Sequence, residues 1–144
     1  MKVKELMTRN VIPAHPEETV ETAARKLARY NVGMLPVCDR GGEICGVITD
    51  RDLVTRCVAS GKAAGATRVR EVMTGQVVSV GAELEVSAAA KLMGRKQVRR
   101  LPVTENGVLC GMLSLGDLAS AEESLMDAGD ALSEISGNIT GLDK

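Results

Sequence analysis

Two short stretches of the chain combine a hydroxyl side chain with a carboxylate three positions later. The first pair is Thr49 and Asp52, and the second pair is Ser114 and Asp117. In each stretch, a glycine and an apolar pair come before the hydroxyl, which predicts a strand that runs into a helix. A hydroxyl, the free backbone N–H groups of a helix start and an acid together suit a sugar phosphate.

The same spacing also has a purely structural explanation. A hydroxyl followed three residues later by an acid forms a capping box, in which the hydroxyl accepts a hydrogen bond from a helix N–H and the acid reaches back. Such a cap stabilises a helix by about 1 kcal/mol. Spacing alone therefore leaves both interpretations of each pair open.

A repeated unit positions these pairs. Residues 3–8 recur as residues 69–74, and residues 32–37 recur as residues 98–103, both displaced by 66 residues. Beyond this point the displacement is 65, because one loop of the first copy is a residue longer. One extra residue in a hairpin loop costs little. The chain is therefore built from two copies of one unit.

Each unit is predicted to follow the order β-α-β-β-α. In the first copy, Thr19 can cap a helix whose apolar residues form a single buried stripe, and Gly41-Gly42 can join two strands. The expected segments are 11–13, 20–30, 35–38, 44–48 and 50–59 in the first copy, and 77–78, 86–96, 101–104, 108–113 and a helix from Ser114 in the second.

Composition excludes several functions. With 44% hydrophobic and 26% charged residues, the 144-residue chain should be globular and soluble. A net charge of −1 gives no field for wrapping nucleic acid, and Tyr30, the only aromatic residue, cannot build a stacking platform. No apolar run approaches a membrane span of about 20 residues, and the start turns polar too early for a secretory signal. We expect a cytoplasmic protein with no nucleic-acid or membrane partner.

Cysteine spacing argues against a metal site. Cys38, Cys45, Cys57 and Cys110 include no pair two or three residues apart, as a zinc knuckle requires. Cys45 and Cys110 occupy matching places in the two copies, so buried strand residues are the simpler interpretation. No nucleophile stands beside a base in either motif, and we predict neither a metal nor catalytic residues.

The motifs, taken in order, resemble a known family. Met-Thr, a strand that contains Leu-Pro-Val and Gly-apolar-apolar-(Thr/Ser)-X-X-Asp each occur twice. This arrangement resembles a tandem pair of cystathionine-β-synthase (CBS) domains, or Bateman module, of the stand-alone bacterial or archaeal type. The resemblance implies an α/β (α+β) fold in which two repeats pack by their sheets with pseudo-twofold symmetry. The expected divisions are repeat 1 at 1–60, a linker at 61–67, repeat 2 at 68–120, and a helical extension with a frayed tail at 121–144.

The resemblance further implies two clefts, each built from both repeats, that bind an adenosine-containing ligand. AMP, ADP or ATP is expected before NAD or S-adenosylmethionine, and no cofactor is required. The first site would contain Thr49, Arg51, Asp52, Thr74, Val77, Val78, Arg99, Arg100 and Pro102. The second site would contain Thr8, Val11, Ile12, Val32, Met34, Pro36, Ser114 and Asp117.

The two predicted sites differ in charge. A carboxylate can accept hydrogen bonds from both ribose hydroxyls, and arginines can hold phosphate oxygens in a bidentate way. Arg99 and Arg100 are assigned to the first site, whereas Gly33 and Met34 stand at the matching positions of the second. The first site is therefore expected to hold phosphate more tightly. Solvated charge at a strand start remains an alternative role for the two arginines.

The tail and the overall function complete the expectations. Leu118, Ala121, Leu125, Ala128, Leu132 and Ile135 follow the spacing of one helical seam. This seam could cover the protein's own core or pack against a second chain in a homodimer. We expect a non-catalytic regulatory module that changes conformation on ligand binding and signals to a separate, unknown partner. The alternative is a structural dimerisation module that binds no ligand.

Overall fold

The chain divides into two compact units, and neither unit is a single sequence repeat. The structure is a computed structural model that describes residues 1–142. Unit 1 contains residues 1–11, 78–106 and the chain from 110 onward, and unit 2 contains residues 12–77 and 107–109. Each unit therefore combines most of one repeat with the leading segment of the other.

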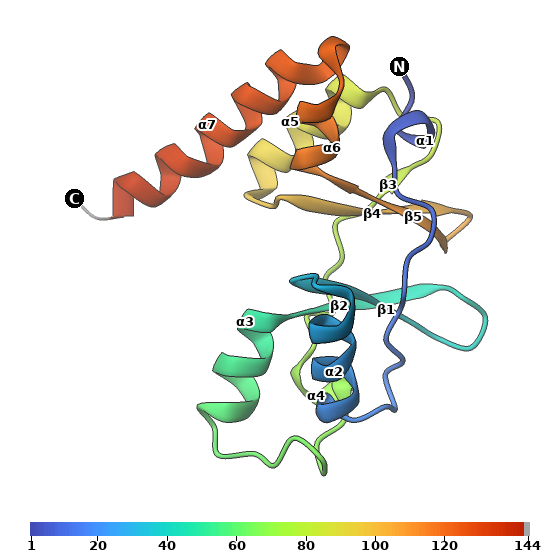
Figure 1. Ribbon diagram of the computed structural model, residues 1–144, viewed down its shortest axis with the longest axis vertical. Helices are drawn as coiled ribbons and strands as arrows, with labels where there is room; N and C mark the ends of the chain where they lie inside the picture. The colour runs from blue at the N-terminus through green and yellow to red at the C-terminus, as the bar shows by residue number, and fades with distance from the viewer. Residues whose placement is uncertain (143–144) are drawn as a thin grey trace. The chain divides into compact units, whose positions relative to one another are not determined.

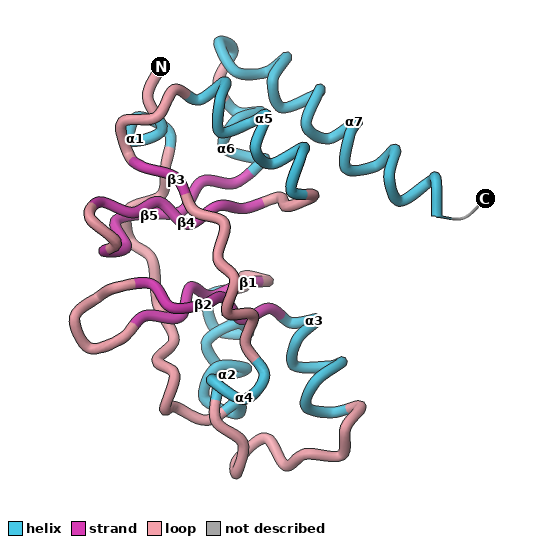
Figure 2. Tube along the Cα trace, turned by 180° about the vertical axis from the view of Figure 1, so that it is seen from behind, coloured by secondary structure: helices cyan, strands magenta, loops and turns pink. Residues whose placement is uncertain are grey.

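Unit 2 is built around a two-stranded antiparallel sheet. Its strands pair with Leu35 opposite Ile48 and Pro36 opposite Val47, and helices pack beside them (Figure 1). The elements are α2 (Val20–Tyr30), β1 (Met34–Cys38), β2 (Ile44–Thr49), α3 (Asp50–Asp52), the π-helix η1 (Leu53–Val58) and α4 (Val69–Val72). Figure 2 displays these strands in magenta and the helices in cyan.

Unit 1 has a three-stranded sheet and a larger set of helices. The strand order is β3-β4-β5, with β3 parallel to β4. The elements are α1 (Val3–Leu6), β3 (Val80–Gly81), α5 (Val86–Lys96), β4 (Arg100–Glu105), β5 (Val108–Ser114), α6 (Leu115–Ser120), the 3-10 helix η2 (Glu122–Ser124) and α7 (Leu125–Leu142). The tip of the β4–β5 hairpin, residues 107–109, is grouped with unit 2.

Two segments, which we call the N-terminal arm (residues 1–11) and the central arm (residues 67–77), complete the two units. In the N-terminal arm, Thr8 bridges Met112 of β5 with backbone hydrogen bonds of 2.8 and 2.9 Å. In the central arm, Thr74 bridges Val47 of β2 with two bonds of 2.9 Å. Each arm thus docks on the strand that ends in the hydroxyl–carboxylate motif of its unit.

Both arms contribute to the hydrophobic cores. Val3 is fully buried in the unit 1 core, and Val69 and Val72 are at most 1% exposed in the unit 2 core. Burying one such valine side chain contributes about 1.5–3 kcal/mol. The arms are therefore part of the folded units and not flexible leaders.

The predicted order of elements is confirmed, with local differences. The helices at Val20–Tyr30 and Val86–Lys96 have the expected bounds. The extended segments expected at 11–13 and 77–78 form no strand; pairing instead begins at Ala14 with Val37 and at β3 with β4. The short helices α1 and α4 were not predicted, because four-residue helices carry too little periodicity to detect.

The predicted helix beyond the second repeat is confirmed, but the prediction of one continuous seam from Leu118 to Ile135 is wrong. The helix that begins after Ser114 ends at Ser120, and Ala121 has extended dihedral angles of φ −108° and ψ 129°. After this break, α7 packs back against α5 and α6. We expected fraying from Ser136, but the helix continues to Leu142, and the rest of that prediction lies outside the described residues. Within residues 1–142, no helix has the length and apolarity needed to cross a membrane.

Candidate ligand-binding sites

Thr49 and Asp52 close the N-terminus of α3 in unit 2. The Asp52 N–H donates to Thr49 Oγ1 at 3.0 Å, and the Thr49 N–H donates to Asp52 Oδ2 at 3.0 Å. Asp52 is only 7% exposed. The capping box expected from the spacing is therefore present, and it fixes the position of the carboxylate.

Ser114 and Asp117 form the same arrangement at the start of α6 in unit 1. The Asp117 N–H donates to Ser114 Oγ at 3.0 Å, and the Ser114 N–H donates to Asp117 Oδ2 at 2.8 Å. The two repeats thus present matching hydroxyl–carboxylate pairs at matching strand-to-helix turns.

Each cap uses only one of the two carboxylate oxygens. Within the described part of the chain, neither Asp52 Oδ1 nor Asp117 Oδ1 accepts a hydrogen bond from the protein. Neither oxygen is among the fully buried, unpartnered side-chain atoms, so solvent reaches both. Each site therefore offers a positioned acceptor that the cap does not consume, and a ligand hydroxyl can donate to it.

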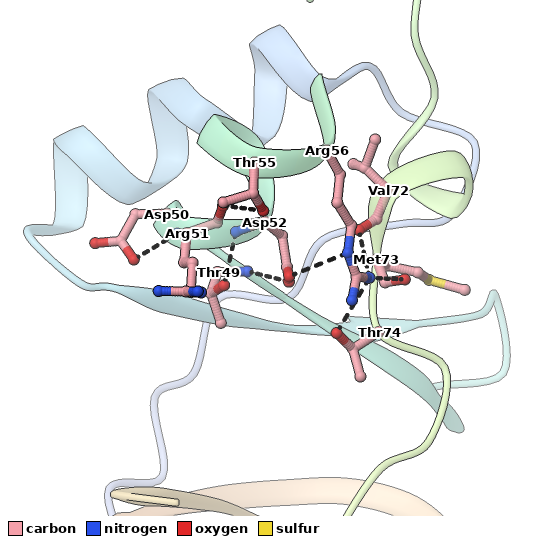
Figure 3. Close-up of polar contacts among 9 residues, drawn as sticks. All are labelled: Thr49, Asp50, Arg51, Asp52, Thr55, Arg56, Val72, Met73 and Thr74. Carbon is pink, nitrogen blue, oxygen red and sulfur yellow. Dashed lines mark hydrogen bonds and ion pairs between the residues drawn. The ribbon is translucent and has the colours of Figure 1, made fainter. Parts of the chain in front are cut away.

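Arg56, which the sequence analysis did not select, completes the unit 2 site (Figure 3). It lies on η1, whose i→i+5 bonding is represented by the 2.8 Å bond from Ala59 N to Val54 O. Its guanidinium lies 3.8 Å from Asp52 Oδ1 and also contacts the central arm. A spacing of four residues after Asp52 on a helix was the signal that could have found it.

A pocket of about 580 Å³ lies beside the unit 1 motif. This volume is within the range of small-molecule sites, about 300–1,000 Å³. Its polar side is formed by Arg99, Arg100 and Ser114, and its apolar side includes Leu125 and Leu132 of α7. The pocket therefore combines two cations with a hydroxyl and an aliphatic wall.

The backbone N–H groups at the two helix starts differ in availability. In unit 2, the Asp50 N–H donates to Gly33 O at 3.1 Å, and the Arg51 N–H donates to Asp50 Oδ1 at 2.8 Å. In unit 1, the Leu115 N–H donates to Arg99 O, whereas the Gly116 N–H has no acceptor among the described residues. A phosphate would therefore find a free N–H donor more readily in unit 1.

The structure distributes the predicted site residues between both units. Unit 2 brings together Thr49, Arg51, Asp52, Thr74 and Val77 of the first predicted site, and Ile12, Val32, Met34 and Pro36 of the second. Unit 1 brings together Thr8, Val11, Ser114 and Asp117 of the second predicted site, and Val78, Arg99, Arg100 and Pro102 of the first. Within one unit, the two arginines are therefore neighbours of Ser114.

The cysteines are free thiols in apolar surroundings. Burial, together with the nearby Cys45, raises the pKa of the Cys38 thiol to about 11, and burial also raises the pKa of Cys45 and of Cys110. Thiols with raised pKa values are protonated at neutral pH and react slowly. Among residues 1–142, no group of three or more His, Cys, Asp or Glu side chains is placed to hold a metal ion.

Comparison with known proteins extends these observations. The chain is 40% identical over 134 residues to the CBS domain-containing protein YhcV of Bacillus subtilis (strain 168), which covers 93% of this chain and 94% of that protein. Hypoxic Response Protein I, solved with two coordinated zinc ions, has a TM-score of 0.78 and 27% identity, covering 83% of this chain and 98% of that one.

A further solved structure contains bound ligands. The CBS domain pair of protein MJ0100, in complex with 5′-methylthioadenosine and S-adenosyl-L-methionine, has a TM-score of 0.74 and 25% identity, covering 83% of this chain and 94% of that one. The CBS domain family itself matches residues 3–59 and 69–124, which contain both hydroxyl–carboxylate motifs. With the repeat, the fold and these matches in agreement, the chain belongs to the CBS-domain family and carries two copies of the domain.

Proposed function

We propose that this CBS pair is a regulatory module that binds an adenosine-containing ligand, performs no catalysis and signals to a separate partner protein. One observation carries the proposal: each unit fixes a carboxylate by a helix cap while leaving Oδ1 accessible. A ribose can donate a hydroxyl hydrogen to that oxygen. The adenosine-containing ligands of the MJ0100 pair support the same chemical class for this chain.

The unit 2 site uses the residues around Asp52. Thr49 and Asp52 hold the ribose, and Val77, which is half-buried, provides aliphatic surface for the base. Exposed Arg51 is close in sequence to the capped turn and supplies positive charge for a phosphate. We retain Thr74 in this site, because its backbone is paired with β2 and its hydroxyl is 3.4 Å from Arg56.

The unit 1 site uses the pocket described above. Ser114, which lines this pocket, holds the ribose together with Asp117, to which it is hydrogen-bonded, and Arg99 and Arg100 of the pocket lining bind phosphate oxygens. The free N–H of Gly116 adds a donor for the same phosphate. The family resemblance implied that both arginines bind the ligand of Thr49. Their place beside Ser114 supports a second possibility, in which they bind the ligand of Ser114. A double-mutant analysis separates the two assignments.

Regulation follows from population shift. A ligand that binds one arrangement of the two units better than another favours that arrangement by its difference in binding free energy. The partner protein then recognises the favoured arrangement. AMP, ADP and ATP are the first candidates, followed by S-adenosylmethionine and NAD.

Thermal unfolding with these five compounds tests the proposal. A ligand at one hundred times its dissociation constant adds about 2.7 kcal/mol, which raises the midpoint by roughly 5–10 °C for a chain of this size. Asp52→Ala and Asp117→Ala should each remove part of this ligand-induced shift, whereas exposed Asp130→Ala on α7 should not. Each aspartate variant also loses a helix cap, which lowers its unfolding midpoint without ligand. The variants are therefore compared by the ligand-induced shift of the midpoint and not by the midpoint itself.

Combining Arg100→Ala with each aspartate variant locates the phosphate. If the effects of an aspartate variant and of Arg100→Ala on the ligand-induced shift are non-additive, that aspartate and Arg100 bind the same ligand. If none of the five compounds raises the wild-type midpoint, the ligand-binding proposal is wrong.

A structural dimerisation module is the second candidate function. Three apolar side chains of α7 are exposed, namely Leu125 at 54%, Met126 at 82% and Leu132 at 43%. Leu125 and Leu132, seven residues apart, share one face of α7. Exposed apolar patches often mark protein interfaces. We propose that they contribute to a homodimer, which is compatible with either function.

A further inference from the structure

Arg56 joins the unit 2 carboxylate to the central arm (Figure 3). Its Nη1 donates to the carbonyl oxygens of Val72 and Met73 at 3.2 and 3.1 Å, and to Thr74 Oγ1 at 3.4 Å. Its Nε lies 3.8 Å from Asp52 Oδ1. One guanidinium therefore contacts both the carboxylate assigned to the ribose and the segment through which the chain leaves unit 2.

These contacts leave the guanidinium free to adjust. Nη1 carries two hydrogens and serves three acceptors, so the bonds are shared and long. The separation between Nε and Asp52 Oδ1 exceeds hydrogen-bond distance, and the Arg56 side chain is 49% exposed whereas that of Asp52 is 10% exposed. An ion pair of this kind is weak, and a ligand hydroxyl can replace it at little cost.

The other unit provides a natural comparison. Thr8 of the N-terminal arm bridges Met112 just as Thr74 bridges Val47. The residue at the position equivalent to Arg56 is Ala121, whose side chain has no hydrogen-bond donor. The two units therefore share the capped carboxylate and the docked arm, and in the described part of the chain unit 2 has an arginine at this position where unit 1 has an alanine.

We propose that Arg56 is a positioning residue that couples occupancy of Asp52 to the central arm. This inference rests on the proposed function. A ribose hydroxyl that donates to Asp52 Oδ1 replaces the Arg56 Nε, and the guanidinium then donates more fully to the carbonyls of Val72 and Met73. The central arm leads directly from Val77 into unit 1, so a change in its stability reaches the other unit through the chain itself.

Hydrogen exchange of the Thr74 amide, measured by NMR with AMP and with S-adenosylmethionine as probes, tests this coupling. The Thr74 N–H donates to Val47 O at 2.9 Å and reports opening of the arm. In the wild type, we expect a bound probe to slow this exchange by about 5-fold. Arg56→Ala should lose most of this slowing, and Arg56→Lys should keep part of it, because lysine retains the charge but not the fork of donors.

The matched control is Arg40→Ala. It removes the same charge from an exposed position in the β1–β2 turn of the same unit and should leave the slowing intact. If Arg56 had only a structural role, Arg56→Ala would change the Thr74 exchange rate by the same factor with and without the probe. The deciding quantity is therefore the slowing that the probe causes in each variant.

Each outcome has one meaning. Suppose that a probe raises the wild-type unfolding midpoint, and that it slows Thr74 amide exchange equally in the Arg56→Ala and Arg40→Ala variants. The proposed coupling is then wrong, and the proposed function stands. If no probe changes the wild-type unfolding midpoint, the coupling and the proposed function are both wrong. If Arg56→Ala does not fold, Arg56→Lys decides: undiminished slowing overturns the coupling, and reduced slowing supports it.

Discussion

Asp52 and Asp117 each use one carboxylate oxygen to cap a helix and leave the other accessible to solvent. From sequence spacing alone, helix capping and ligand binding were alternative roles for these two carboxylates. The geometry makes them compatible, because a carboxylate has two oxygens and the cap needs only one. The cap also fixes the side chain before any ligand arrives, which lowers the entropic cost of binding.

Gly46 and Gly111 are the residues over which the arms pass. A methyl group at Gly46 would lie 2.8 Å from both Met73 Sδ and Thr74 O, and one at Gly111 would lie 2.9 Å from Thr8 O. Backbone oxygens cannot move aside as a flexible side chain can. We predict that Gly46→Ala destabilises the protein by roughly 2 kcal/mol, measured by urea unfolding.

Gly75→Ala is the matched control for this substitution. It follows Thr74 directly, and no atom lies within 4 Å of the position that its methyl group would occupy. Its effect should be within about 0.5 kcal/mol. Equal stability of Gly46→Ala and Gly75→Ala would contradict the close docking of the central arm.

At the scale of elements, the break between α6 and α7 decides which side chains of the tail are buried. Spacing could not reveal it, because steps of three and four continue through the turn. The break is stabilised by Ser124, whose hydroxyl donates to Leu118 O at 2.5 Å. Ala128, Ala131 and Ile135 pack inward at 3–4% exposure, and Ala131 was not part of the predicted seam.

The exposed apolar side chains of α7 lead to a prediction about dimer formation. Met126→Gln combined with Leu132→Gln should shift the mass measured by light scattering from a dimer, about 30 kDa, toward the 15.2 kDa monomer. Ser133→Gln, an exposed change on the same helix, is the control. A wild-type monomer, or a double variant that remains dimeric, would rule out this interface.

At the scale of the whole molecule, internal similarity predicted the repeat, the order of elements and both capped turns. Internal similarity alone could not predict which copy each arm completes, whereas the family resemblance assigned Thr74 to the site of Thr49 and Thr8 to the site of Ser114. The N-terminal arm and the central arm have similar sequences, so either could pair with the strand before Thr49 or with the strand before Ser114. Long-range pairing selects between them, and spacing carries no information about it. The hydrogen-bond acceptors of Arg56 were missed for a related reason, since they lie 16 to 18 residues away in the central arm, and only its spacing of four from Asp52 was visible in the sequence.

The exchange of arms predicts how fragments fold. Residues 1–66 and residues 12–77 are fragments of equal length, but only the second contains Val69 and Val72, which are at most 1% exposed. Losing two buried valines costs roughly 3–6 kcal/mol, which is most of the stability of a domain this small. Fragment 12–77 should therefore unfold in a cooperative thermal transition, followed by circular dichroism, whereas fragment 1–66 should show none. A cooperative transition in 1–66 that matches that of 12–77 would mean that the central arm is not part of the unit 2 core, and the sequence repeat would then be the folding unit.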